Sequence, residues 1–141
     1  MILLDTNIVS EVMKASPADN VLAWLNEQDS GKLYVSAITI GEIVYGLRIL
    51  PDGKRRLGLR EKFEKFIALA FDQRVLAYDE LAARAYGELM GHRKALGRPM
   101  SISDGQIAAI ARSKHLVVAT RNVFDFESCS VDVIDPFVTT G

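Results

Sequence analysis

Short apolar runs alternate along this chain with longer segments whose apolar residues recur every three or four positions. Runs of aliphatic and β-branched residues predict five short buried strands, at residues 1–4, 33–35, 75–77, 116–119 and 131–134. The helical spacing predicts five helices between them, over residues 17–25, 40–50, 59–70, 79–89 and 103–111. Strands that alternate with helices are typical of a mostly parallel sheet covered on both faces. We therefore expect an α/β fold with a central sheet of four to five short strands flanked by helices.

The expected helix ends carry residues that favour caps and turns. Ser16 precedes Pro17, which suits a first helical position, and Asp79 suits the residue before a helix. The Pro-Asp-Gly sequence at residues 51–53 is a turn signal that ends the second helix. No repeat or linker composition interrupts the pattern, so residues 1–141 are predicted to form one domain.

Composition agrees with a single globular domain. The 141 residues are 49% hydrophobic and 25% charged, and at this size folding buries roughly 68–70% of the unfolded chain's surface. Cys129 is the only cysteine, which excludes an intrachain disulfide and a cysteine-based zinc site. The longest unbroken apolar stretch, residues 66–71, is far shorter than the roughly 18 residues of a membrane helix. We expect a cytoplasmic protein without a membrane partner.

Positive charge is concentrated in two segments, although the formal net charge is only -1. The first segment contains Arg48, Lys54, Arg55, Arg56, Arg60, Lys62 and Lys65. The second contains Arg93, Lys94, Arg98, Arg112, Lys114 and Arg121. Basic residues that cluster on a folded surface bind polyanions. They are equally typical of the solvent-exposed face of a long helix, so the charge pattern alone leaves both interpretations open.

Two acidic side chains lie where expected strands end or helices begin. Asp5 ends the first strand, and Glu42 lies near the start of the second helix. Ligands of parallel sheets bind beyond the carboxyl ends of the strands, so both carboxylates are expected at the functional edge. Asp5 can instead cap the next helix, together with Thr6 and Asn7. Glu42 can instead form a capping box with Thr39.

Asp104 is harder to explain by a structural role alone. Ile107 and Ala108 follow it at helical spacing, which places its carboxylate on the apolar face of the helix. A cap at Ser101 or Ser103 is available, and the helix dipole would stabilise an acid here by roughly 0.3–1 kcal/mol. The effective penalty for burying an ion is several kcal/mol, which is larger. We therefore expect a bound cation or a firm hydrogen-bond network at Asp104.

A further group of oxygen-bearing side chains follows the strand at residues 116–119, namely Thr120, Asn122 and Asp125. Several carboxylates brought to one sheet edge repel one another unless a proton or a multivalent cation neutralises them. Oxygen ligands without paired His or Cys favour Mg²⁺ or Mn²⁺ over Zn²⁺. His92 and His115 are isolated and are not spaced as metal ligands, so both are expected on the surface.

A divalent ion at such a site would turn water into a nucleophile at neutral pH and stabilise charge on a phosphoryl group. The basic segments would hold the polyanionic backbone that the acids alone repel. The charge pattern as a whole therefore favours hydrolysis of phosphodiester bonds in RNA or DNA. The catalytic candidates are Asp5, Glu42, Asp104 and Asp125.

The sequence resembles the PIN-domain ribonucleases of the VapC toxin group, particularly their FitB-like branch. The resemblance spans essentially the whole chain and is carried by four segments: MILLDTNIVSE at 1–11, SAITIGEIVYG at 36–46, DGQIAAIA at 104–111 and VATRN at 118–122. It implies a single PIN-like domain in which Asp5, Glu42 and Asp104 are metal-site carboxylates, with Thr6 and Thr120 as polar supports. Asn7 and Asn122 are further polar candidates at the same edge.

The resemblance also implies Mg²⁺- or Mn²⁺-dependent cleavage of RNA, a homodimer and inhibition by a small cognate antitoxin of the VapB type. The toxin and antitoxin together would form a higher assembly on operator DNA. The chain departs from many relatives at Asn122, where their fourth acid falls, and Asp125 is the neighbouring substitute. Candidate contacts to RNA phosphates are Lys54, Arg55, Arg56, Arg93, Lys94, Arg98 and Arg121, with Arg48 and Arg60 beside them.

Three other functions fit the α/β pattern less well. A phosphoacceptor receiver domain has an acidic pair after its first strand and a late lysine, whereas Thr6 and Asn7 follow Asp5 here and no lysine follows Ala119. A haloacid-dehalogenase-like phosphatase would need an aspartate at Asn7. A non-catalytic nucleic-acid-binding module of PIN type stays open because of Asn122. Binding that is insensitive to EDTA would favour that module, and cleavage restored by a divalent metal would favour the nuclease.

Overall fold

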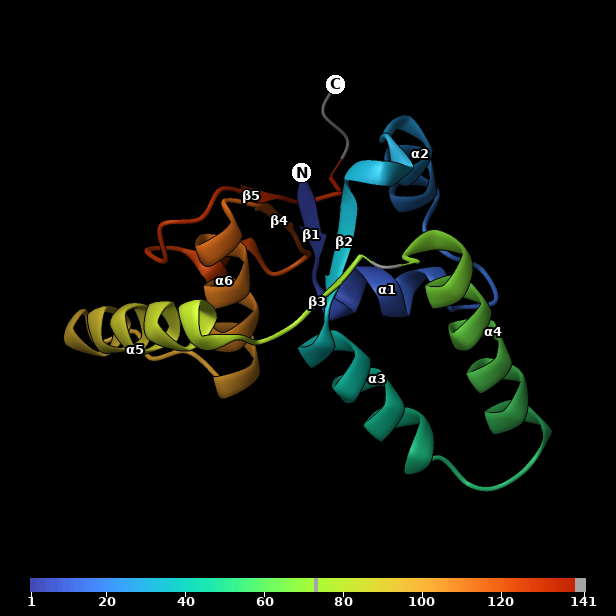
Figure 1. Cartoon of the computed structure of the whole chain (residues 1–141). Helices are drawn as coiled ribbons and strands as arrows, with labels where there is room; N and C mark the ends of the chain where they lie inside the picture. Colours follow the sequence, from blue (N-terminus) through green and yellow to red (C-terminus); the bar gives the residue numbers. More distant parts are fainter. Residues whose placement is uncertain (73, 139–141) are drawn as a thin grey trace.

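Five short strands form one parallel sheet in the order β3-β2-β1-β4-β5 (Figure 1). The computed structural model describes residues 1–72 and 74–138. The strands are β1 (Ile2–Leu4), β2 (Leu33–Ser36), β3 (Val75–Leu76), β4 (Val117–Ala119) and β5 (Val133–Ile134). Leu3 lies opposite both Tyr34 and Val118, so β1 is the central strand. The five predicted strands and the parallel α/β sheet are confirmed.

Six α-helices and two short 3₁₀ helices connect the strands in the described part of the chain. They are α1 (Thr6–Val12), α2 (Asp19–Glu27), η1 (Ser30–Lys32), α3 (Ala37–Arg48), α4 (Lys54–Ala70), α5 (Glu80–Ala95), α6 (Ile102–Lys114) and η2 (Val123–Phe126). Asp79 caps α5 as predicted, because its side chain accepts a hydrogen bond from the Ala82 amide. The predicted start at Ser16 is wrong: α2 begins at Asp19, after Ala18, which offers no side-chain cap.

The two faces of the sheet are covered by different helices, as Figure 1 shows. Leu3 and Val118 point to one face, where their core cluster includes buried residues of α5 and α6. Leu4, Val35 and Ala119 belong to a second cluster, which includes buried residues of α1, α3 and α4. Burying a Leu or Val side chain contributes roughly 1.5–3 kcal/mol. Burial on both faces therefore fixes the register of β1 and the position of the residue that follows it.

Helices α5 and α6 pack closely at the glycine that follows Asp104. A Cβ atom added at Gly105 would lie 2.5 Å from the Met90 sulfur and 3.1 Å from Cε2 of Tyr86. Gly105 therefore allows both side chains to approach the first turn of α6. This packing holds the first turn, and with it the backbone of Asp104, against α5.

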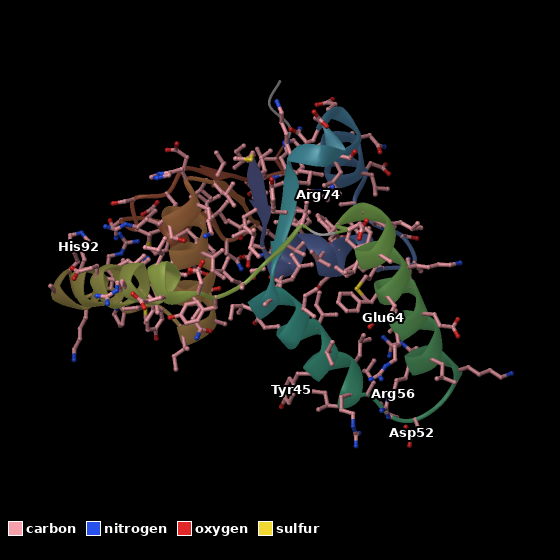
Figure 2. All side chains as sticks on the ribbon, in the orientation of Figure 1. Tyr45, Asp52, Arg56, Glu64, Arg74 and His92 are labelled. Atoms are coloured by element: carbon pink, nitrogen blue, oxygen red, sulfur yellow. The ribbon has the colours of Figure 1, made fainter. Side chains whose placement is uncertain are left out.

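The described helices are each too short or too polar to cross a membrane. Cys129 is buried as a free thiol. Both histidines are exposed as expected, with His92 far along α5 (Figure 2) and His115 directly after α6.

Candidate active site

A cavity of about 410 Å³ opens at the carboxyl edge of the sheet, where β1, β2 and β4 end. It is lined by Asp5, Thr6, Asn7, Ser10, Glu11, Lys14, Glu42, Asp104, Arg121, Asn122 and Phe137. Asp5 comes from the end of β1, Glu42 from α3 and Asp104 from the first turn of α6. Three carboxylates that are far apart in sequence therefore share one cavity.

Asp5 is buried between the end of β1 and the start of α1. Its Oδ1 accepts a hydrogen bond from the Thr6 amide at 2.8 Å, so Asp5 does cap α1. Its Oδ2 accepts from the Thr120 hydroxyl at 2.8 Å and from the Asn7 amide group at 3.3 Å. Burial raises the pKa of Asp5 to about 6, against the effect of the Thr120 and Thr6 hydrogen bonds. The charges of Asp104 and Glu42 raise it further.

Glu42 is held by a chain of hydroxyl groups that begins in the core. The Thr6 hydroxyl donates to Oε1 of Glu42 at 2.7 Å and lies 3.0 Å from the Thr39 hydroxyl. Because Thr6 has one hydroxyl proton, the Thr39 hydroxyl must donate to it and accept from Ser36. The capping-box alternative for Thr39 and Glu42 is wrong, since Ser36 caps α3 and the Glu42 carboxylate accepts from Thr6. The network fixes Glu42 from the buried side of the cavity.

Asp104 is half-buried in the first turn of α6. Its backbone amide donates to the Ser101 side chain at 3.2 Å, which is the cap that the sequence offered. Burial raises the pKa of the Asp104 carboxyl, opposed by a hydrogen bond with Ser101. The charges of Asp125 and Glu42 raise this pKa further, and the charge of Arg93 lowers it. Asp5 and Asp104 thus both hold their protons more tightly than an ordinary aspartate.

Thr120 ties the end of β4 to the end of β1. Besides donating to Asp5, its hydroxyl accepts from the side chain of Asn7 at 3.2 Å and from the amide of Asn122 at 3.0 Å. The carbonyl oxygen of the Asn7 side chain accepts from the Arg121 amide at 3.2 Å. The four polar candidates Thr6, Asn7, Thr120 and Asn122 therefore all lie at the cavity or in its hydrogen-bond network.

The oxygen donors that line the cavity suit a hard divalent cation, although the described carboxylates do not converge on one point. Carboxylates with raised pKa values and mutual repulsion are stabilised by a nearby dication. Across residues 1–72 and 74–138, however, no three His, Cys, Asp or Glu side chains are close enough to hold a metal ion together. Mg²⁺ commonly binds through one or two carboxylates and keeps several waters. The arrangement is compatible with such a hydrated ion.

Asp125 lies in η2, outside the residues that line the cavity. Its charge still raises the pKa of Asp104, so the two carboxylates are close enough to interact. The loop that carries it is held by Arg93, which donates to the backbone oxygens of Asp125 and Glu127 at 2.9 and 2.8 Å. Arg93 also donates to the Arg98 carbonyl at 2.7 Å.

The candidate RNA contacts are corrected by these interactions. Arg93 is only 4% exposed and its guanidinium is committed to backbone carbonyls, so it is not available to a phosphate. Arg56 pairs with Asp52 at the α3–α4 turn (Figure 2), and Arg98 pairs with Glu127. The side chains that stay exposed are Arg48, Lys54, Arg55, Lys94 and Arg121. Among these, Arg121 lines the acidic cavity.

Several cavity residues were missed from the sequence. Glu11 is buried, and its two oxygens accept from Lys14 at 2.9 Å and from the Ala18 amide at 3.1 Å. The Lys14 hydrogen bond is the main reason that the pKa of Glu11 lies below its usual range. Ser10, Glu11 and Lys14 follow one face of the helix after Asp5, which was the available signal. Phe137 reaches the cavity from the segment after β5 and had no local signal.

Comparison with known proteins places the chain in a family. Residues 2–124 match the PIN domain. The chain belongs to the PIN domain family. It is 42% identical to VapC ribonuclease Y4jK of Sinorhizobium fredii over 97% of this chain and 98% of that protein. It is 38% identical to toxin FitB of Neisseria gonorrhoeae, over 97% of this chain and 99% of that one.

The PIN domain fold is shared with solved structures over its full length. The structure of FitAB bound to the IR36 DNA fragment contains a chain that superposes with a TM-score of 0.93 at 36% identity. The match covers 100% of this chain and 99% of that chain. The predicted resemblance to the VapC and FitB PIN domains is therefore confirmed.

Proposed function

We propose that this PIN domain is an endoribonuclease that acts as the toxin of a toxin–antitoxin pair. The observation that carries the proposal is the cavity in which Asp5, Glu42 and Asp104 meet at the carboxyl edge of the sheet. The nuclease activity is supported by full-length similarity to a VapC ribonuclease, and the toxin role by similarity to toxin FitB. Hydrolysis of an RNA phosphodiester bond is the reaction that this acidic site and the exposed Arg121 in its lining suit best.

Cleavage would depend on Mg²⁺ or Mn²⁺ bound at the acidic cavity. Asp5 and Asp104 would ligate the ion directly, with Glu42 as a further ligand or as a partner of a bound water. When bound, the ion would supply an activated water and stabilise charge on the phosphoryl group. Thr120 and Thr6 would orient Asp5 and Glu42 through the hydrogen bonds they already make.

Metal affinity should weaken at acid pH because protons compete for Asp5. A carboxyl with a pKa of about 6 is protonated below that pH and ionised above it. The apparent affinity for Mn²⁺ is therefore expected to fall about tenfold per pH unit below pH ~6 and to level off above pH ~7. Calorimetric titration at a series of pH values measures this. An affinity that stays constant from pH ~5 to ~8 would contradict a site that includes Asp5.

Asp125 is expected to support the site without ligating the metal. Asp125→Asn should weaken Mn²⁺ affinity or cleavage by roughly 10–100-fold, because the charge of Asp125 acts on the carboxyl group of Asp104. Asp132→Asn, at an exposed aspartate further along the same loop, is the matched control. Binding isotherms that coincide for Asp125→Asn and the control would leave Asp125 with a purely local role in η2.

We further propose a small antitoxin as partner, together with a homodimer and an assembly on operator DNA. The antitoxin and DNA parts are supported by the shared fold with a chain in the structure of FitAB bound to the IR36 DNA fragment. A groove of about 730 Å³ between α1, α3 and α4 adjoins the acidic cavity, and the two share Thr6, Ser10, Lys14 and Glu42. Its floor is apolar, with Met13, Ile43, Leu47 and Leu59, and basic residues Lys54, Arg55 and Lys62 stand beside it. The apolar face of an antitoxin helix with acidic flanks fits this surface.

Placing a charge in this groove should block the antitoxin. Gly58 lies in the groove with open space around its Cα, so Gly58→Glu is expected to add a carboxylate without a clash. Co-expression with the cognate antitoxin should relieve growth inhibition by the native chain but not by Gly58→Glu. Gly87→Glu, at an exposed position of α5 where an added Cβ also meets nothing within 4 Å, is the control. Equal relief of all three proteins would contradict this docking site.

The proposed activity is tested by incubating the purified chain with total cellular RNA and mapping the cut ends. Discrete, reproducible cleavage sites are expected. Intact RNA together with EDTA-insensitive RNA binding would instead favour a PIN domain that acts by binding.

A further inference from the structure

The cavity contains one aromatic side chain, Phe137, among its described lining residues, and Arg121 stacks on it. The guanidinium carbon of Arg121 lies 4.5 Å from the centre of the Phe137 ring. Arg121 follows β4 and Phe137 follows β5, and these strands are paired in parallel. The sheet itself therefore brings the cation and the ring together at the edge of the acidic site.

The Arg121 guanidinium is available to a ligand. Although four acidic residues line the same cavity, no ion pair or side-chain hydrogen bond of Arg121 occurs within the described residues. Its backbone is fixed instead, since its amide donates to the Asn7 side chain at 3.2 Å. A guanidinium carries five donors in a fork that matches phosphate geometry. An exposed guanidinium that forms no ion pair with the described residues, beside the proposed phosphodiester-cleaving site, is suited to hold a phosphate.

The Phe137 ring is held in place between the core and the cavity. It packs against the core cluster that includes Met13 and Val21. The backbone around it is fixed too, because the Phe137 amide donates to Oδ1 of Asp135 at 2.9 Å and its carbonyl accepts from Asn20 at 3.1 Å. The fixed ring holds the Arg121 guanidinium plane in place, so little ordering cost is paid when a base stacks on that plane.

We infer that Arg121 and Phe137 form a nucleotide subsite for single-stranded RNA at the mouth of the acidic cavity. Arg121 binds a backbone phosphate next to the scissile bond, and the adjoining base stacks on the outer face of the Arg121 guanidinium, whose other face rests on the Phe137 ring. Bases in a duplex are already stacked on their neighbours, so this subsite selects unpaired segments. The inference rests on the proposed ribonuclease function and names the form of RNA that the site accepts.

A second arginine–phenylalanine pair in the chain provides an internal control. Arg98 lies 4.4 Å from the centre of the Phe124 ring, at nearly the same spacing. Arg98 is paired with Glu127, however, and neither Arg98 nor Phe124 lines the acidic cavity. The two pairs share their contact and differ in their access to the site, so only the Arg121–Phe137 pair should affect RNA binding.

The test measures RNA binding apart from cleavage. The cleavage-deficient Asp104→Asn protein is titrated, with Mg²⁺ present, into a short single-stranded RNA that carries 2-aminopurine, whose fluorescence falls on stacking. Adding Phe137→Leu is expected to weaken binding roughly tenfold, within the range of about 5- to 150-fold per stacked base, and to reduce the quenching. Adding Arg121→Gln should lower the slope of log affinity against log salt by about 0.7. Adding Phe124→Leu should change affinity less than about twofold.

Two further arms separate the possible outcomes. Phe137→Trp keeps an aromatic ring beneath the Arg121 guanidinium and should restore binding, which shows that the loss in Phe137→Leu is not a folding defect. The same sequence as a duplex should bind independently of residue 137. If Phe137→Leu binds like its parent, or if Phe124→Leu loses as much, the subsite is refuted even where the native chain cleaves RNA. If the native chain cleaves no RNA but binding depends on Phe137, the subsite stands and the nuclease proposal fails.

Discussion

Asp104→Asn is expected to fold normally and to lose RNA cleavage by about a thousandfold or more. The carboxylate lies half-buried in the acidic cavity, where it would ligate the metal, and the charges of Asp125 and Glu42 already oppose its ionisation. Loss of a hard ligand removes several kcal/mol of metal-dependent stabilisation of the transition state, and about 1.4 kcal/mol corresponds to tenfold in rate. Asp5→Asn and Glu42→Gln should have effects of the same order.

The measurement is cleavage of a mapped RNA site by variants whose folding is checked by circular dichroism and thermal unfolding. Glu88→Gln is the matched control for Glu42→Gln, since both are exposed glutamates within helices and only Glu42 lines the cavity. Glu88→Gln should cleave at the native rate. Native turnover by folded Asp104→Asn would remove Asp104 from the site.

Arg93→Met is expected to lower the free energy of unfolding by about 3 kcal/mol. The buried guanidinium donates to the carbonyls of Arg98, Asp125 and Glu127. Each buried group left without its partner costs about 1–3 kcal/mol, and partial entry of water reduces the sum. Methionine retains much of the apolar length of the arginine stem, so the loss reports mainly on the hydrogen bonds.

Lys94→Met provides the control for this prediction. Lys94 is the next residue of α5 and is exposed, so its replacement should change the free energy of unfolding by less than about 0.5 kcal/mol. Urea unfolding of both variants gives the comparison. Similar midpoints would mean that Arg93 does not hold the loop between β4 and β5. A large effect of Arg93 alone would explain how that loop keeps Asp125 near Asp104.

The strands and the site edge could be predicted because their signals are local. Each strand is a short apolar run, and Leu4 followed by Asp5 marks both the buried end of β1 and the start of the polar edge. Parallel topology then implies that residues after different strands meet. The position of Asp104 among apolar helix residues likewise indicated a charge that needs a partner. The structure places the Asp104 side chain in the lining of the acidic cavity.

The partners of individual side chains could not be predicted from local signals. Glu42 has the spacing of a capping box with Thr39, but it accepts instead from Thr6, which is 36 positions away in sequence. Arg93 has the appearance of a surface base within a basic stretch, yet it is buried under the loop after β4. Phe137 reaches the cavity only because β5 pairs with β4. Such contacts depend on the packing of distant segments, which local periodicity does not specify.

The most direct test of the proposed function is metal-dependent cleavage by the native chain. Purified protein is treated with EDTA, dialysed, and assayed on a single-stranded RNA containing a mapped cleavage site, with Asp104→Asn in parallel. We expect no cleavage by the metal-free protein, restoration by Mg²⁺ or Mn²⁺, and no restoration in Asp104→Asn. Cleavage that persists at the native rate in EDTA, or that Asp104→Asn performs equally well, would contradict a metal-dependent nuclease built on these carboxylates.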